Sequence, residues 1–108
     1  MIKIAEVCGE SLNTRFYGAS LKDYIMKRYS SRNKIILDFS NVKSMSQSFA
    51  DQCFGMIVAE IGLNSFQKNF KIINIKADVG KMIKYVALKR AKKINNKSKN
   101  QKSHAAMA

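Results

Sequence analysis

The chain has 108 residues and a formal net charge of +13, from 20 Lys and Arg residues against 7 Asp and Glu residues. This length allows one domain with a small core, and no apolar run approaches the roughly 20 residues that a membrane span needs. Cys8 and Cys53 lie far apart in apolar contexts, so we expect buried free thiols and not a disulfide or a metal pair. The N-terminus lacks the long apolar run of a signal peptide, and we expect a cytoplasmic protein without membrane association.

The first predicted unit is a strand followed by a helix. Residues 2–8 alternate loosely between apolar and polar side chains and predict the strand. Asn13 or Thr14 can cap a helix that extends to about Tyr29, because their side-chain oxygens can accept hydrogen bonds from the free amides of the first turn. The apolar face of this helix is predicted to consist of Tyr17, Leu21, Tyr24 and Ile25.

The second predicted unit organises the rest of the chain. Residues 34–39 contain an unbroken apolar run that is typical of a strand covered on both faces. Residues 48–62 carry apolar side chains at offsets of three and four, which predicts an amphipathic helix. A buried strand, a polar turn and such a helix make half of a βαβ unit. We expect four of its residues to be buried together: Ile36, Leu37, Phe54 and Ile57.

A third strand at residues 68–75 and a third helix from Asp78 complete the pattern. The order β-α-β-α-β-α predicts an α/β fold with a small, mostly parallel sheet and right-handed crossovers. We place the domain at residues 1–90. Residues 91–108 form a basic C-terminal tail that we predict to be disordered, because its side chains are too polar to pack.

Seven of the 20 basic residues lie at positions 89–108, where there is no acidic residue. Such a segment could contact nucleic-acid phosphates, or it could simply be a solvated extension. No aromatic side chain is interleaved to stack on bases. The candidate phosphate contacts are Lys89, Arg90, Lys92, Lys93, Lys97 and Lys99.

Little in the sequence indicates an enzyme. The single histidine, His104, lies in the polar tail, and there is no carboxylate pair, glycine-rich phosphate loop or Cys/His cluster. Asp38 could act as a base at the end of its strand. An aspartate in this position more often accepts hydrogen bonds from the next loop, here Ser40 and Asn41. We therefore predict a non-catalytic protein without cofactor or metal, in which these three residues order the loop.

Ser48 precedes the second predicted helix, and Asp51 follows three residues later, as in a variant of the capping box. Two interpretations are open: Ser48 only caps the helix, or it is a phosphorylatable serine that a partner recognises. A phosphate on Ser48 would be favoured by the positive end of the helix dipole and opposed by the negative charge of Asp51.

Small and polar residues also form a line along this helix, away from its apolar face. Such a line allows another backbone to approach closely, and that backbone could belong to a neighbouring helix or to a partner. The line consists of Ser48, Gln52, Gly55 and Ala59.

The region between the second strand and the second helix resembles a known family. The stretches that carry the resemblance are Asp38-Phe39-Ser40-Asn41-Val42, Met45-Ser46-Gln47-Ser48-Phe49-Ala50-Asp51 and Phe54-Gly55. They resemble the STAS-like domain of unknown function found in bacterial proteins, over roughly residues 5–90. This group is similar in turn to the STAS domains of anti-sigma-factor antagonists.

In those antagonists, a strand ending in Asp-hydrophobic-Ser leads to a serine or threonine at a helix start. A switch kinase with a histidine-kinase-type ATP-binding fold phosphorylates that residue. By this resemblance, Asp38 and Ser40 match the strand end, and Ser48 matches the phosphoacceptor. The antagonists usually have glycine after the phosphoacceptor, whereas this chain has Phe49.

We therefore expect a regulatory protein-interaction module that binds a protein partner through the loop 40–48 and the helix 48–62, under the control of Ser48 phosphorylation. The resemblance implies that a histidine-kinase-type ATP-binding protein could be the partner, and a second copy of the chain could also bind. The alternative is a nucleic-acid-associated protein that uses the basic tail. The predicted partner-binding residues are Ser46, Ser48, Gln52, Gly55 and Ala59.

Overall fold

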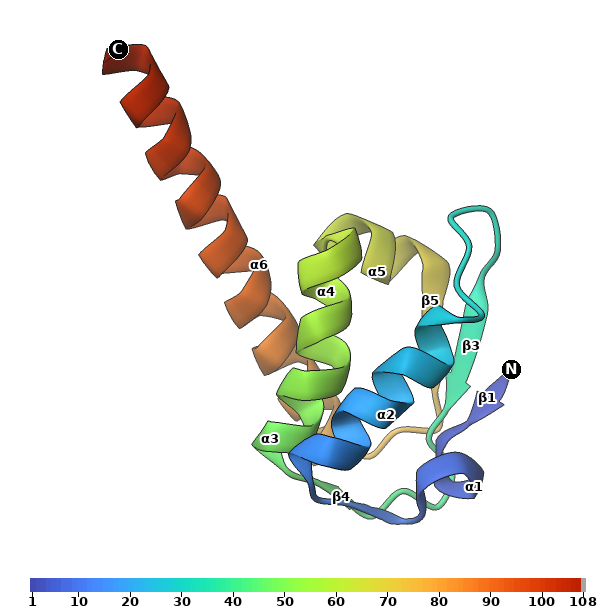
Figure 1. Ribbon diagram of the computed structural model, residues 1–108. Coiled ribbons are helices and arrows are strands. Elements are labelled where there is room, and N and C mark those ends of the chain that lie inside the picture. Colours follow the sequence, from blue (N-terminus) through green and yellow to red (C-terminus); the bar gives the residue numbers. More distant parts are fainter. Residues whose placement is uncertain (108) are drawn as a thin grey trace.

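Three short parallel strands form the central sheet of the computed structural model, which describes residues 1–107 and the side chains up to Lys92 (Figure 1). The order across the sheet is β1 (Ile2–Lys3), β3 (Ile35–Asp38) and β5 (Phe70–Ile73). Leu37 in the central strand is level with Ile2 on one side and Ile72 on the other. A second parallel pair is formed by β2 (Ser11–Leu12) and β4 (Ser44–Met45).

The helices complete a mixed α/β fold. The first two are α1 (Ile4–Cys8) and α2 (Arg15–Met26). The next three segments, α3 (Gln47–Ala50), η1 (Asp51–Gly55) and α4 (Met56–Ile61), follow one another without a break, and we call residues 47–61 the second helix. The last two are α5 (Leu63–Asn69) and α6 (Ala77–Met107).

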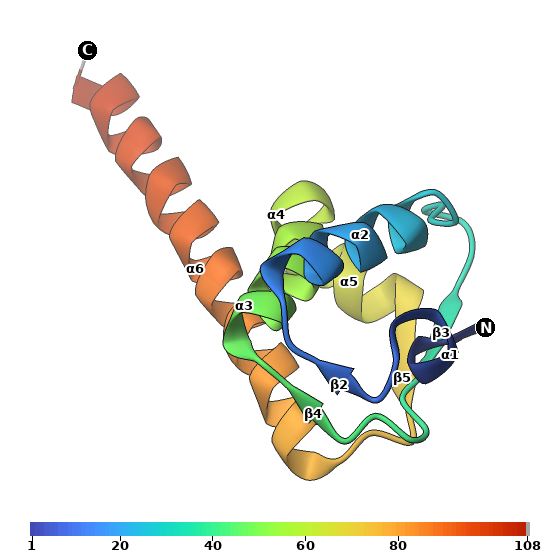
Figure 2. The same cartoon turned by 60° about the horizontal axis from the view of Figure 1, so that its bottom comes forward.

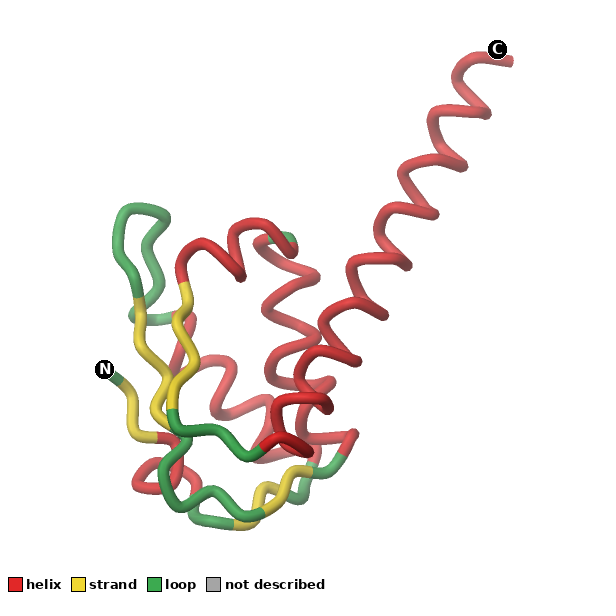
Figure 3. Tube along the Cα trace, turned by 180° about the vertical axis from the view of Figure 1, so that it is seen from behind, coloured by secondary structure: helices red, strands yellow, loops and turns green. Residues whose placement is uncertain are grey.

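The helices form a layer beside the sheet. Figure 2 shows α2 beside the second helix, and α6 packs along the second helix in turn. Figure 3 shows the strands from the other side. Ile35 and Leu37 lie on the face toward the helices and are buried, as is Phe70 in β5. The opposite face carries the intervening residues, which include Lys3, Ile36 and Lys71.

The core is a row of aromatic rings between the sheet and the helices. Phe39 follows β3, and its ring centroid lies 5.9 Å from that of Phe54. Phe54 lies 6.4 Å from Phe66, which lies 5.5 Å from Phe70. Rings at such separations add to the hydrophobic stabilisation from burial. The strands, the second helix and α5 are therefore held by one continuous contact.

The prediction that Leu37, Phe54 and Ile57 are buried is confirmed, since all three are 0% exposed. The prediction for Ile36 is wrong because its side chain is only half-buried on the face that points away from the helices. The strand is therefore covered fully on one face and not on both.

Two predicted strands begin or end at the wrong residue. Of the residues 2–8, only Ile2–Lys3 form a strand, and the rest form the helix α1. Ile4 and Cys8 lie one helical turn apart on the side of α1 that packs on the core. The predicted strand 68–75 is a strand only at Phe70–Ile73. Gly62, with a φ of 87°, ends α4, and α5 begins at once with Leu63 and Phe66 on its inner side.

The predicted helix that begins near Asp78 is the start of α6, which continues to Met107 as one helix. The side chains of residues 93–108 lie outside the part that the structure describes. The separation of a domain at residues 1–90 from a disordered tail at 91–108 therefore stays a prediction.

Candidate functional site

Asp38 ties together the carboxyl ends of two neighbouring strands. Its Oδ1 accepts hydrogen bonds from the Ser40 backbone N–H at 2.9 Å and from the Ser40 hydroxyl at 2.7 Å. The same oxygen accepts a third bond from Nδ2 of Asn74, just after β5, at 3.1 Å. The bonds from Ser40 are the main reason that the pKa of Asp38 is lowered, and the bond from Asn74 adds to them. A carboxylate held in this way is a weak base and serves to order the loop.

A polar cavity of about 410 Å³ lies beside this cluster. Carboxyl ends of parallel strands are where ligands bind in open α/β sheets. The walls hold one lysine, two carboxylates and the Ser40 hydroxyl, which donates to Asp38. The lining residues are Lys3, Ala5, Glu6, Asp38, Ser40 and Asn41.

Ser46, and not Ser48, caps the second helix. The Ser46 hydroxyl accepts from the Phe49 backbone N–H at 3.1 Å and donates to the Asn13 carbonyl at 2.9 Å. The backbone N–H of Ser46 donates to the carbonyl of Leu12 at 2.8 Å. The prediction that Ser48 caps the helix is therefore wrong. The cap moves by two residues because the short pair β2–β4 holds Ser46 against the segment before α2.

The N-terminal ends of α2 and the second helix consequently lie side by side (Figures 1 and 2). Thr14 caps α2 by accepting from the Tyr17 backbone N–H at 3.1 Å, as predicted for Asn13 or Thr14. The helix α2 and the second helix approach closely at Gly18, which has no side chain. A Cβ at this position would lie only 2.6 Å from the carbonyl oxygen of Phe49. Two positive helix ends therefore meet at one end of the molecule.

Ser48 is exposed in the first turn of the second helix, and its hydroxyl makes no hydrogen bond within the described part of the chain. The next residue, Phe49, is 0% exposed, so its ring lies in the core and not beside the serine hydroxyl. The free hydroxyl lies close to backbone amides that have no partner in the helix. Of the predicted residues, Ser48 is the one whose hydroxyl is left accessible.

The predicted line of small residues is divided between the surface and the interior. Ser48 and Ala59 are exposed, Gln52 is half-buried, and Gly55 is buried. A Cβ on Gly55 would lie 2.7 Å from Oδ1 of Asp51 and 3.2 Å from Cγ of Arg90. The backbone at Gly55 is therefore approached by α6 of the same chain, which corrects the prediction that Gly55 belongs to a partner surface.

Arg90 in α6 forms a bidentate ion pair with Asp51. Its Nε lies 2.9 Å from Oδ1 and its Nη2 lies 2.7 Å from Oδ2 of Asp51. This contact lowers the pKa of Asp51 and raises the pKa of Arg90, and Arg15 and Lys89 lower the pKa of Asp51 further through their charge. Asp51 begins a π-helical turn, in which the Met56 N–H donates to the Asp51 carbonyl. Such turns are frequent at functional sites.

The ion pair between Arg90 and Asp51 involves one of the predicted nucleic-acid contacts. Arg90 is occupied by Asp51, whereas Lys89 and Lys92 are exposed on α6. The remaining candidates, Lys93, Lys97 and Lys99, have side chains outside the described part.

Two exposed aromatic residues were not predicted to lie at the surface. Phe16 is 73% exposed and Tyr17 is 57% exposed, and their rings form an edge-to-face pair with centroids 5.6 Å apart. The sequence places Tyr17 one turn before Leu21, which suggested a buried position. The close approach at Gly18 instead turns α2 so that Gly18, Leu21 and Ile25 face inward. The phase of the helix is therefore set by a tertiary contact.

Neither thiol is poised for chemistry. Cys53 is buried, and burial raises the pKa of its thiol well above the usual value. Cys8 is half-buried, and its pKa is also raised by burial. Among the residues that the structure describes, no group of three or more His, Cys, Asp or Glu side chains could hold a metal ion. Within the same residues, no helix has the length and apolar character to cross a membrane.

Comparison with known proteins gives one match. Residues 17–79 match the model of a family described as the STAS-like domain of unknown function. The match takes in most of α2, the strand with Asp38, the whole of the second helix and β5. No curated protein and no solved structure matches the chain.

Proposed function

The chain belongs to the family of STAS-like domains of unknown function, and on this premise we propose that it is a non-catalytic regulatory module that binds another protein. Its partner docks where the N-terminal ends of α2 and the second helix meet, together with the end of the loop 40–48. We call this region the helix-end surface and define it by five residues: Arg15, Phe16, Tyr17, Gln47 and Ser48.

The observation that carries this proposal is the exposure of Phe16 and Tyr17 in the first turn of α2, whose N-terminal end meets that of the helix that carries the accessible Ser48. An exposed aromatic pair is unfavourable in water, and aromatic side chains are the residues that most often dominate binding energy at protein interfaces. Backbone amides at the two helix ends are available to a carboxylate or a phosphate. The helix-end surface therefore combines an apolar anchor with a site for negative charge.

Phosphorylation of Ser48 is the control that we propose for this surface. The negative charge of Asp51, which would repel a phosphate, is neutralised by Arg90 through two hydrogen bonds. Arg15 contributes a further positive charge near Asp51. A phosphate on Ser48 would thus be tolerated by the domain while it changes the charge presented to the partner. A histidine-kinase-type ATP-binding protein, which the family resemblance implies, is the partner that would add it.

The test begins with affinity capture from the host, followed by titration of the captured partner against purified variants. Phe16→Ala should weaken binding at least about tenfold, because it removes an anchor from the centre of the contact. The matched control is Tyr85→Ala, which removes another exposed aromatic side chain, from α6. It should leave the affinity within about twofold of the parent.

Circular dichroism on each variant separates loss of binding from loss of folding. Phe16 is largely exposed, so its truncation should leave the melting temperature nearly unchanged. Equal binding by the parent and both variants would reject the helix-end surface as the docking site.

A second candidate function is contact with nucleic-acid phosphates. The observation that favours it is the composition of α6, where residues 79–92 contain four Lys and one Arg and no acidic residue. A steep loss of DNA or RNA affinity with salt would support it. Protein docking through Phe16 predicts a shallow salt dependence, because apolar contacts are not screened.

A further inference from the structure

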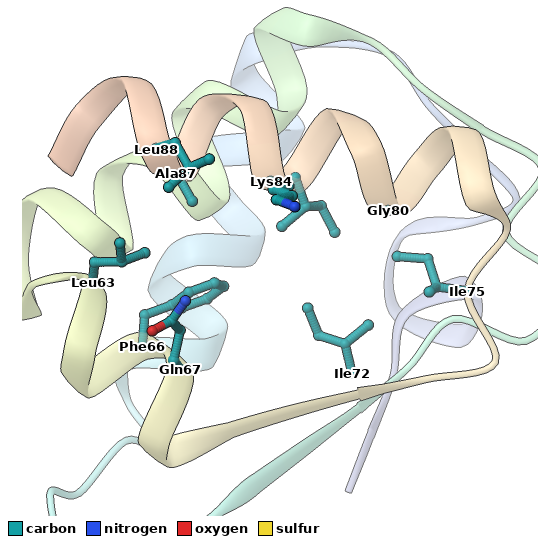
Figure 4. Close-up of a pocket in the computed structure, with 10 residues that line it drawn as sticks. Leu63, Phe66, Gln67, Ile72, Ile75, Gly80, Lys84, Ala87 and Leu88 are labelled. Atoms are coloured by element: carbon teal, nitrogen blue, oxygen red, sulfur yellow. The ribbon is translucent and has the colours of Figure 1, made fainter. Parts of the chain in front are cut away.

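The strand β5 leaves one edge of the sheet open. In the described part of the chain the sheet order is β1-β3-β5, so nothing pairs with the outer side of β5. The helix α6 packs along the second helix and lies above the space beside β5 (Figure 4). A right-handed crossover through a helix in this position would place a further parallel strand at the same edge. The fold thus has room for one more strand beneath α6.

The hydrogen-bonding groups on this edge follow from the parallel pairing with β3. The carbonyl of Ile73 accepts from the Phe39 N–H at 3.0 Å, so Lys71 and Ile73 direct their backbone groups toward β3. The alternate residues direct theirs outward. The N–H of Phe70 donates to the Phe66 carbonyl at the end of α5. The carbonyl of Phe70 and both backbone groups of Ile72 therefore point to the open edge.

An apolar groove of about 340 Å³ runs beside the same edge, between α5, β5 and α6. Figure 4 shows Phe66 and Ile72 on one side of it and Lys84 and Ala87 on the other. A strand added to β5 would send every second side chain into this space, as in other cases of strand addition. The apolar residues that form the walls include Leu63, Phe66, Ile72, Ile75, Ile83 and Ala87.

The surroundings of the groove are strongly basic. Residues 61–77 and 79–92 contain no Asp or Glu, and Lys84 stands at the groove itself. Lys71 and Lys76 are exposed on the strand side, and Lys81 is exposed on α6. A second copy of the chain paired through β5 would bring identical lysines together, which is unfavourable. Acidic side chains would instead find complementary charge.

From these observations we propose that the edge of β5 and its groove bind an extended segment of an acidic partner protein. The segment adds a strand to β5, places apolar side chains between Ile72 and Ala87, and presents carboxylates on the opposite face of the sheet, where Lys71 lies. This docking site is separate from the helix-end surface, because it uses β5, α5 and α6 and not the start of α2. Its backbone hydrogen bonds supply affinity, and the groove selects alternating sequences.

The probe for this site is a fluorescein-labelled hexapeptide of alternating glutamate and valine. Lys71→Glu should weaken its binding to the full chain at least about tenfold, because the attraction between Lys71 and the glutamates on the same face of the sheet becomes a repulsion. The matched control is Lys81→Glu, which makes the same change in net charge on α6, outside the groove lining. It should change the affinity by no more than about twofold, since solvent screens the more distant charge.

Two N-methylated probes test strand addition itself. One carries the methyl groups on its valines and the other on its glutamates, and only one set of amides can face β5. Strand addition predicts that one probe loses binding and the other keeps it, and that the Ile72 amide becomes protected from hydrogen exchange. Equal effects of the two N-methylations, equal binding by both lysine variants, or no binding up to about 1 mM would each overturn the proposal. So would a dimer in which the Ile72 amide is already protected without the probe.

Discussion

The helix-end surface and the groove beside β5 use close packing in opposite ways. Near the helix ends, Gly18 lets the backbones of two helices approach closely, and Gly55 leaves space that the side chains of Asp51 and Arg90 fill. The hydroxyl and the N–H of Ser46 both make hydrogen bonds within the chain. Beside β5, Gly80 has only the side chain of Ile75 within 4 Å of an added carbon, and the Ile72 backbone groups face outward. The first region is therefore a rigid platform with a few exposed side chains. The second region leaves backbone N–H and C=O groups of β5 unpaired and accessible to a binding partner.

The largest expected effect comes from adding one carbon to each region. Helix propensity alone favours alanine over glycine by about 1 kcal/mol. Gly80→Ala should show this gain, because the new carbon makes an ordinary contact at 3.7 Å. Gly18→Ala should instead lower the free energy of unfolding by about 1–3 kcal/mol, since α2 must move away from the Phe49 backbone. Urea denaturation of both variants measures the difference, and the same sign for both would contradict the packing described for α2.

The second expected effect separates two serines in the same turn. Ser46→Ala should cost about 0.5–2 kcal/mol, because it leaves the Phe49 N–H without its cap. Ser48→Ala should stay within about 0.5 kcal/mol of the parent, since its hydroxyl is exposed and makes no such bond. Thermal melts monitored by circular dichroism provide the comparison. A larger loss of stability in Ser48→Ala than in Ser46→Ala would mean that Ser48 caps the helix, as the sequence suggested.

These two comparisons indicate which features the sequence could predict. Thr14 as a cap, the strand Ile35–Asp38 and the helix 47–61 follow from local patterns, because capping and apolar periodicity act over a few residues. The resemblance to STAS-like domains came from the segment between Asp38 and Gly55, which lies inside the matched residues 17–79. Local signals were thus sufficient for the fold class.

The missed features depend on contacts between distant residues. The exposure of Tyr17 depends on how closely Gly18 meets Phe49, and the burial of Gly55 depends on Arg90. The cap at Ser46 depends on the β2–β4 pair, whose strands are too short to leave a periodic signal. None of these contacts can be read from residues that are neighbours in the sequence. The groove beside β5 likewise combines three separate elements.

The smallest expected effect is the pH dependence of the contact that fixes α6 to the second helix. Asp51 has a lowered pKa in the folded protein, mainly because of its hydrogen bonds with Arg90. Folding therefore favours the ionised form of Asp51. The stabilisation is present above the unfolded pKa of about 3.9 and is lost as the pH falls through the lower folded pKa. Because both side chains are partly exposed, we expect a contribution of up to about 1 kcal/mol.

Arg90→Met keeps most of the aliphatic packing against Gly55 and removes the charge. The variant should be less stable than the parent at pH 7, and the difference should shrink as the pH falls below about 4, where the parent loses the same interaction. Urea denaturation at pH 7, 5 and 3 measures it. Lys92→Met is the matched control, because Lys92 is exposed on the same helix and should show little difference at any pH. A stability gap for Arg90→Met that stays constant from pH 7 to pH 3 would mean that Arg90 acts through packing alone. In that case the ion pair would contribute nothing to holding α6 in place, and the rigidity of the platform would rest on the glycine contacts.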